Sequence, residues 1–91
     1  MYLHLGQESV VNDGEIVGIF DLETTTVSKN TRSFLTKAEK NKEVINVSYE
    51  LPKSFIICSK GKRDKRVYIS QISSLTLYGR AKRKYQNLYF E

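Results

Sequence analysis

The stretch LPKSFIICSKGKRDKRVYIS, residues 51–70, decides the fold. Its two halves contain aromatic and β-branched residues at 55–57 and 67–69, which favour extended strands. The residues between them, 60–66, include a glycine and almost nothing that a protein buries. We therefore interpret the stretch as a β-hairpin with a cationic tip. Against the single acid Asp64, the tip carries Lys60, Lys62, Arg63, Lys65 and Arg66.

The first strand of this hairpin is apolar on both sides. Phe55 and Ile57 are predicted to face one side of the sheet, and Ile56 and Cys58 the other, because successive side chains of a strand alternate. A strand that is buried on both faces lies inside a sheet rather than at its edge. We therefore expect a central strand with cover on each face.

The N-terminal part of the chain predicts three further strands. Short strands are expected at residues 2–5 and 7–11, followed by a turn at 12–14, where Asn, Asp and Gly tolerate positive φ angles. A buried strand is expected at residues 15–21. Gly18 inside it marks a bulge or the close approach of another backbone.

Two helices and one more strand complete the expected order. A helix is predicted from a cap at Ser28 to about residue 41, a half-buried strand at 43–49, and a second helix from Ser73 or Ser74 to about residue 84. The apolar stripe of the first helix consists of Thr31, Phe34, Leu35 and Ala38. Its cations are interpreted as a solvated surface: Lys29, Arg32, Lys37 and Lys40.

This order lacks a long alternation of strands and helices. It predicts an α+β fold: a small, mainly antiparallel sheet with one or two helices packed against it. At 91 residues we expect a single domain at 1–85 and a C-terminal tail at 86–91. Cys58 is the only cysteine, so no disulfide framework is possible within the chain and a reducing, cytoplasmic location is expected. No apolar window is long enough for a membrane span.

Catalytic chemistry is not expected. The single histidine, His4, has no metal-ligating residue at a suitable spacing, and the apolar neighbours of Cys58 predict a buried, unreactive thiol. Asp21 and Glu23 can face one side as a pair, but nothing basic or metal-binding accompanies them. A glycine-rich phosphate loop is absent. We therefore predict a protein that is not an enzyme and that has no cofactor and no metal.

Positive charge is concentrated at one end of the chain. Residues 1–59 hold six basic residues (Lys or Arg) and eight acidic residues (Asp or Glu). Residues 60–91 hold nine basic residues and two acidic residues. Such a gradient is typical of a phosphate-binding surface, but also of a charged tip that keeps a small protein in solution. The hairpin tip and residues 80–84 would form one surface if the second helix packs beside the hairpin. Tyr78 and Tyr85 flank the second group, where stacking on RNA bases is a weaker alternative.

A set of short motifs, in order along almost the whole chain, resembles a known family. The motifs are MYLHLG at 1–6, VGIFD at 17–21, Phe34-Leu35, Pro52-Lys53-Ser54, Val67-Tyr68, and SSLTL at 73–77 with Arg80. Together they are similar to the RemA/RemB-like proteins, in particular the RemB branch. These are small cytoplasmic proteins of Gram-positive bacteria linked to control of extracellular-matrix (biofilm) genes. The RemA branch is a DNA-binding regulator thought to form a ring-like homo-oligomer that presents arginines to DNA.

The chain departs from the RemA pattern at the arginines. An arginine-rich stretch before the strand that begins at Ser54 is replaced by residues 50–53, where only Lys53 is positive, and Glu15 stands in place of an arginine. The resemblance therefore implies the fold and a homo-oligomer more directly than the DNA site. If duplex DNA is bound, the candidate contacts are Lys53, Lys60, Lys62, Arg63, Lys65, Arg66, Arg80, Lys82, Arg83 and Lys84. The alternative is an oligomeric protein–protein interaction module of the same fold that does not bind DNA.

Overall fold

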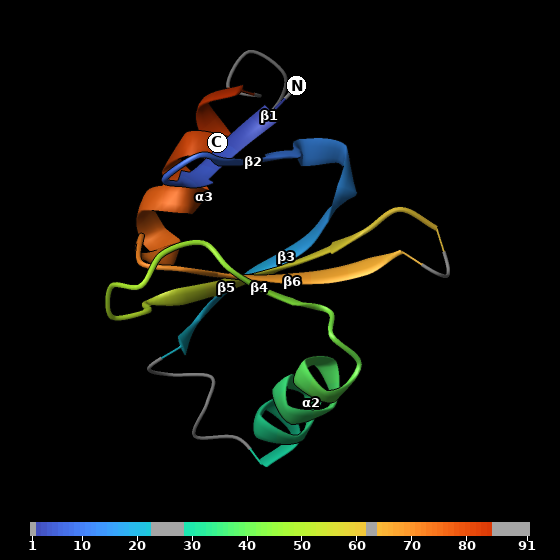
Figure 1. Cartoon of the computed structure of the whole chain (residues 1–91). Helices are drawn as coiled ribbons and strands as arrows, with labels where there is room; N and C mark the ends of the chain where they lie inside the picture. The colour runs from blue at the N-terminus through green and yellow to red at the C-terminus, as the bar shows by residue number, and fades with distance from the viewer. Residues whose placement is uncertain (1, 23–28, 62–63, 85–91) are drawn as a thin grey trace.

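The hairpin predicted from residues 51–70 lies at the centre of the molecule (Figure 1). The structure is a computed structural model that describes residues 2–22, 29–61 and 64–84. Strand β5 (Ser54–Ser59) pairs antiparallel with β6 (Lys65–Ser70), with Ser54 opposite Ser70 and Ser59 opposite Lys65. At the tip, the backbone N–H of Lys60 donates to the carbonyl oxygen of Asp64 at 2.9 Å.

Two more strands extend this pair into a four-stranded sheet of order β3-β5-β6-β4. Strand β3 (Ile16–Asp21) pairs antiparallel with β5, and the short strand β4 (Val44–Asn46) pairs parallel with β6. Strand β5 is therefore central, as predicted. The mainly antiparallel α+β fold is confirmed, and its parallel pair was not foreseen.

The predicted bulge at Gly18 is present. The pairing of β3 with β5 shifts register between Ile16 and Gly18. A Cβ atom at Gly18 would lie 2.6 Å from the ring of Phe20, which itself stacks on Phe55 with ring centroids 5.0 Å apart. Glycine is required here because the aromatic ring occupies the space of a side chain.

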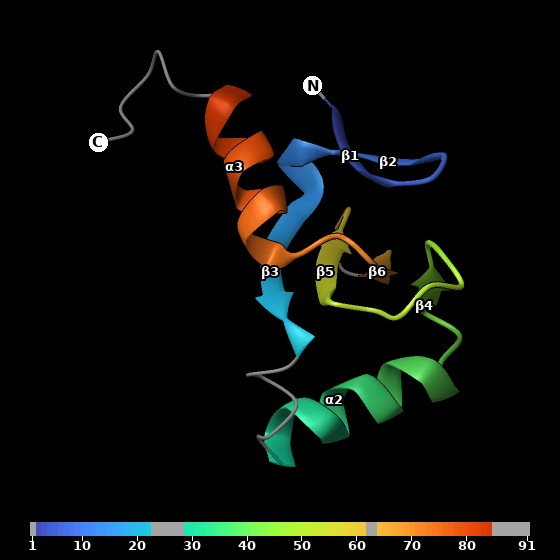
Figure 2. The same ribbon diagram turned by 90° about the vertical axis from the view of Figure 1, so that its left-hand side faces the viewer.

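Helix α2 (Lys29–Lys40) covers one face of the sheet (Figure 2). Ala38 is buried against Phe55 and Val67, and Phe34 and Leu35 are half-buried in the same cluster. The stripe predicted from helical spacing thus faces the sheet. The predicted cap, Ser28, lies outside the described residues.

The opposite face is covered by a second, separate sheet and by helix α3 (Ser74–Lys84) (Figure 2). Strands β1 (Tyr2–Gly6) and β2 (Ser9–Asn12) form this two-stranded sheet, and the 3-10 turn η1 (Asp13–Glu15) leads from it into β3. The buried residues of this core are Leu3, Leu5, Val11, Ile19, Val47, Ile56, Cys58, Tyr68 and Leu77. The division into two sheets was not predicted, because strand length and alternation do not specify the partner of a strand.

The strand predicted at residues 43–49 is shorter than expected. Strand β4 ends at Asn46, although the N–H of Val47 still donates to the carbonyl oxygen of Ile69 at 2.9 Å. The chain then turns, with the Ser48 hydroxyl accepting from the N–H of Glu50 at 3.1 Å. Tyr49 is left fully exposed, so its alternation with Val47 does not mark a strand.

Helix α3 begins at a conventional cap. The Ser73 hydroxyl accepts from the N–H of Thr76 at 3.2 Å, which satisfies one of the free donors of the first turn. Leu77 is fully buried, whereas a Cβ atom at Gly79 would meet nothing within 4 Å. Gly79 therefore weakens the helix without a packing reason.

We predict that Gly79→Ala raises the free energy of unfolding by about 0.5–1 kcal/mol, because alanine loses less backbone entropy in a helix. Gly18→Ala is the matched replacement and should lower that free energy by about 1–3 kcal/mol, because its methyl group displaces the stacked ring of Phe20. Urea unfolding followed by circular dichroism measures both. Equal effects of the two replacements would contradict this account of the glycines.

Candidate nucleic-acid interface

The hairpin tip projects cations into solvent at one end of the four-stranded sheet (Figure 1). Lys60 and Lys65 are exposed, and Lys62 and Arg63 lie outside the described residues. The Lys65 ammonium lies 4.4 Å from the centroid of the Phe34 ring, a cation–π contact between β6 and α2. At the tip, Lys65 therefore lies on the face of the sheet that α2 covers.

Arg66 points to the other face and is engaged within the protein. Its guanidinium forms an ion pair with Glu15, lies 3.3 Å from an Asp64 carboxylate oxygen, and donates to the Tyr68 hydroxyl at 3.2 Å. The hydrogen bond to Glu15 raises the pKa of the Arg66 guanidinium above its usual value. Of the predicted tip contacts, Arg66 is thus neutralised by two acids before any phosphate approaches.

Lys53 lies at the opposite end of β5 from the tip. Its N–H donates to the carbonyl oxygen of Ser70 at 2.8 Å, and its own carbonyl oxygen accepts from Leu22 at 3.0 Å. A strand of this length spans about 20 Å. The exposed Lys53 side chain therefore does not share a local patch with Lys60.

The basic end of α3 is also separate from the tip. Arg80 donates to the carbonyl oxygen of His4 at 3.0 Å, on the side of β1, and the final turn contains Lys82, Arg83 and Lys84. Figures 1 and 2 place this turn beyond β1, away from the tip. The second helix does not pack beside the hairpin tip, so the two basic groups do not form the single local surface considered from sequence.

Of the two aromatic residues predicted to stack on bases, the structure describes only Tyr78. The Tyr78 hydroxyl donates to the carbonyl oxygen of Ile19 at 2.8 Å, so this end of the side chain is held against β3. Tyr85 lies outside the described residues. The hydrogen bond gives Tyr78 a structural role in docking α3 on the sheet.

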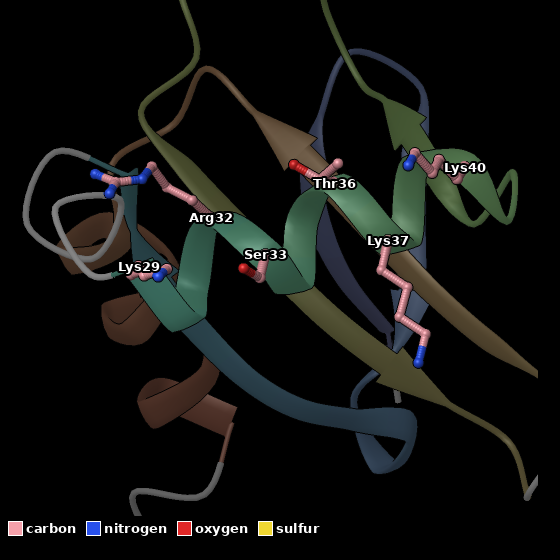
Figure 3. Close-up of a pocket in the computed structure, with 6 residues that line it drawn as sticks. All are labelled: Lys29, Arg32, Ser33, Thr36, Lys37 and Lys40. Atoms are coloured by element: carbon pink, nitrogen blue, oxygen red, sulfur yellow. The ribbon is translucent and has the colours of Figure 1, made fainter.

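The structure also gathers cations that sequence reasoning assigned to plain solvation. A shallow depression on the outer side of α2 is lined by Lys29, Arg32, Ser33, Thr36, Lys37 and Lys40 (Figure 3). Because the apolar stripe of α2 faces the sheet, these residues all come to the opposite side of the helix. One sequence signal could have indicated this grouping: the cations and the small hydroxyl residues recur at helical spacing.

Cys58 is buried and His4 contacts the backbone. Burial raises the pKa of the Cys58 thiol to about 11, so the thiol stays neutral and unreactive at neutral pH. The His4 ring nitrogen Nε2 lies 2.6 Å from the carbonyl oxygen of Gln7, within the β1–β2 turn. Among the described residues, no group of three His, Cys, Asp or Glu side chains is placed to hold a metal ion.

Comparison with known proteins identifies the family. The family model described as RemA-like, extracellular matrix regulatory protein A-like, matches residues 2–81. The chain belongs to this family. A relative, extracellular matrix regulatory protein B of Bacillus subtilis (strain 168), is 40% identical over 81 residues, which cover 89% of this chain and 90% of that protein. Within the described part of this RemA-like chain, no helix is long and apolar enough to cross a membrane.

We predict that Glu15→Gln lowers the free energy of unfolding by about 1–2 kcal/mol, because Arg66 then lacks its main carboxylate partner. Urea unfolding at low and high salt measures the effect. Glu8→Gln, at an exposed position, is the control and should have almost no effect. A Glu15→Gln variant as stable as the parent would show that the pair does not hold the turn before β3 to β6.

We further predict that Cys58 makes stability fall with rising pH between about 9 and 11. The thiol keeps its proton in the folded state but loses it in the unfolded state in this range, so deprotonation favours unfolding. Below about pH 9 both states hold the proton and the contribution is constant. Urea unfolding of the parent and of Cys58→Ala should show a stability difference that shrinks across this range; a constant difference would contradict the prediction.

Proposed function

We propose that this RemA-like chain is a cytoplasmic regulator of extracellular-matrix genes that assembles as a homo-oligomer and contacts DNA phosphates through its hairpin tip. The observation that carries the proposal is the match to the extracellular matrix regulatory family over residues 2–81. A 40% identical relative carries the same kind of name. The action proposed is binding and not catalysis.

The hairpin tip is the proposed contact because of its charge and exposure. Lys60 and Lys65 are exposed at the tip, and Lys62 and Arg63 lie between them in the sequence. Lysine and arginine side chains neutralise phosphates without reading base sequence, so this contact positions the protein on a duplex. Lys53 and the α3 group lie elsewhere, so they are not part of the contact proposed here.

A homo-oligomer strengthens such a contact. One tip offers only a few cations, and each phosphate contact weakens steeply with salt. Subunits that present identical tips to one duplex make the later contacts intramolecular, which raises the overall affinity without any new kind of interaction. Assembly is therefore part of the proposed function.

A second candidate is a protein–protein interaction module of the same fold. Tyr49 is fully exposed and Leu51 is 81% exposed, and both lie in the connection between β4 and β5. Single exposed apolar residues are common, but two within one short connection are the beginning of a patch that could meet a partner protein. The pairing of Glu15 with Arg66 also favours it, because an arginine that is already paired with an acid offers less charge to DNA.

We predict that replacing Lys60, Lys62, Arg63 and Lys65 with glutamate abolishes retention of duplex DNA, because the tip then repels phosphates. Arg66 is left in place, since its ion pair belongs to the fold. The measurement is fluorescence anisotropy of a labelled duplex at two salt concentrations, with light scattering for the mass of the assembly. Replacing the three lysines with arginine is the control that keeps the charge and should keep the binding.

A parent protein that forms an oligomer but ignores duplex DNA at low salt would rule out the DNA-contacting function. The interaction module would then be the better account. Undiminished DNA binding by the glutamate variant would instead remove the tip from the contact surface while leaving DNA binding itself in place.

A further inference from the structure

The outer side of α2 is arranged differently from an ordinary solvated helix surface. Lys29 and Lys40 stand near its two ends, Lys37 stands at the flank, and the small hydroxyl residues Ser33 and Thr36 lie between them (Figure 3). All five side chains are exposed. Short side chains between long cationic ones leave a shallow depression in which an anionic group can approach both hydroxyl and ammonium donors.

Three lysines of this face, Lys29, Lys37 and Lys40, form no ion pair with another described residue. Glu39 is the only acid in the helix. Natural surface helices commonly alternate opposite charges at spacings of three and four residues, which stabilises the helix by a few tenths of a kcal/mol per pair. These three lysines lack that stabilisation from opposite charges.

One edge of this face, at Lys37, lies near Lys65 of the hairpin tip. The Lys65 ammonium sits on the ring of Phe34, and Lys37 is one helical turn further along α2 than Phe34. Two backbone hydrogen bonds hold the end of the helix against β6: the N–H of Glu43 donates to Ala38 at 2.9 Å, and the N–H of Val67 donates to Glu43 at 2.8 Å. The positions of the helix and of the tip are therefore coupled by fixed contacts.

We propose that the outer face of α2 is a second phosphate-binding surface, continuous with the hairpin tip, and that the backbone of duplex DNA lies across both. This inference rests on the proposed DNA-contacting function and adds the element that shares the contact. Lys29 and Lys40 are about 16 Å apart along the helix axis. One strand of a duplex carries a phosphate about every 3.4 Å of axis, so the face is long enough to meet more than one phosphate.

The chemistry of the face favours a nucleic acid over a membrane. An amphipathic helix that binds a membrane inserts its apolar side among the lipids. The apolar side of α2 is already occupied by the sheet, where Ala38 is buried against Phe55 and Val67. The depression on the outward side is lined by cations and hydroxyl residues, which suit phosphates that stay in water.

This surface also differs from the one that the sequence suggested. Helix α3 covers the opposite face of the four-stranded sheet from α2 (Figure 2). A duplex that lies across the tip and α2 therefore does not reach the final turn of α3 on the same subunit. Lys82, Arg83 and Lys84 supply a control of equal charge on an equivalent element.

The experiment compares two triple variants of the full chain. One carries Lys29→Gln, Lys37→Gln and Lys40→Gln, and the other carries Lys82→Gln, Arg83→Gln and Lys84→Gln. Glutamine keeps the helix propensity of lysine, so both variants should fold, which circular dichroism checks. Binding of a labelled duplex is measured by anisotropy over a series of salt concentrations, and anionic phospholipid vesicles serve as the competing polyanion.

We expect the α2 variant to bind duplex about tenfold more weakly at 0.1 M salt for each lysine that contacts a phosphate. The slope of log affinity against log salt should become shallower by about 0.9 for each such lysine. The α3 variant should keep the slope of the parent protein. Vesicles should not compete with the duplex at matched salt.

Three results would overturn the inference. Equal losses in the two variants would show a general effect of net charge, and an unchanged α2 variant would show that the tip acts alone while the proposed function stands. A parent protein that binds vesicles and not duplex would overturn both the inference and the proposed function. If the α2 variant binds like the parent, the tip variant described above should still lose duplex binding, because the tip alone would then hold the duplex.

Discussion

The rest of the structure depends on the need to cover the β5–β6 hairpin on both faces. Ile56 and Cys58 are fully buried on one side of β5 and Phe55 is 3% exposed on the other. Burying each large apolar side chain contributes about 1.5–3 kcal/mol, and an uncovered face would forgo that gain. Helix α2 supplies one cover, and the β1–β2 sheet with α3 supplies the other. The separate sheet, the parallel strand β4 and the two helices follow from that requirement.

The tip of the same hairpin extends beyond both covers, and its charge follows from this. Residues that reach past the packed layers must be soluble, so they tolerate lysine and arginine where the strands require apolar residues. The boundary is at Arg66, whose pairing with Glu15 links the first residues beyond the core to the entry of β3. At this boundary the Arg66 side chain forms contacts within the protein. Further out, Lys60 and Lys65 keep exposed charges.

The arrangement of the layers decides which cations can act together. Helix α2 lies on the face towards which Lys65 points, and the contact of Lys65 with Phe34 joins the two elements. Helix α3 lies on the other face and directs Arg80 towards β1. Two basic groups that are near each other in sequence, at the tip and at the end of α3, are therefore separated. The lysines on the outer face of α2, which precede the tip in the sequence, are instead brought near it.

The sequence by itself determined the elements and their faces. Alternation in β5, the stripe of Phe34, Leu35 and Ala38, the bulge at Gly18 and the cap at Ser73 are local patterns, because each depends on the geometry of a few consecutive residues. The motifs at 1–6, 17–21 and 73–77 likewise sufficed to indicate the family that the comparison with known proteins then showed.

Only the tertiary structure decided which residues and strands pair with one another. Glu15 and Arg66 are 51 residues apart, and no local rule pairs them. The split into two sheets, the parallel pairing of β4 and the basic outer face of α2 all depend on which layer covers which side of the hairpin. Spacing along a helix shows that cations share one face. Whether that cationic face is exposed depends on which other element packs against the opposite face. For this reason the core could be read from residue patterns, whereas the candidate interface became visible only when the layers were in place.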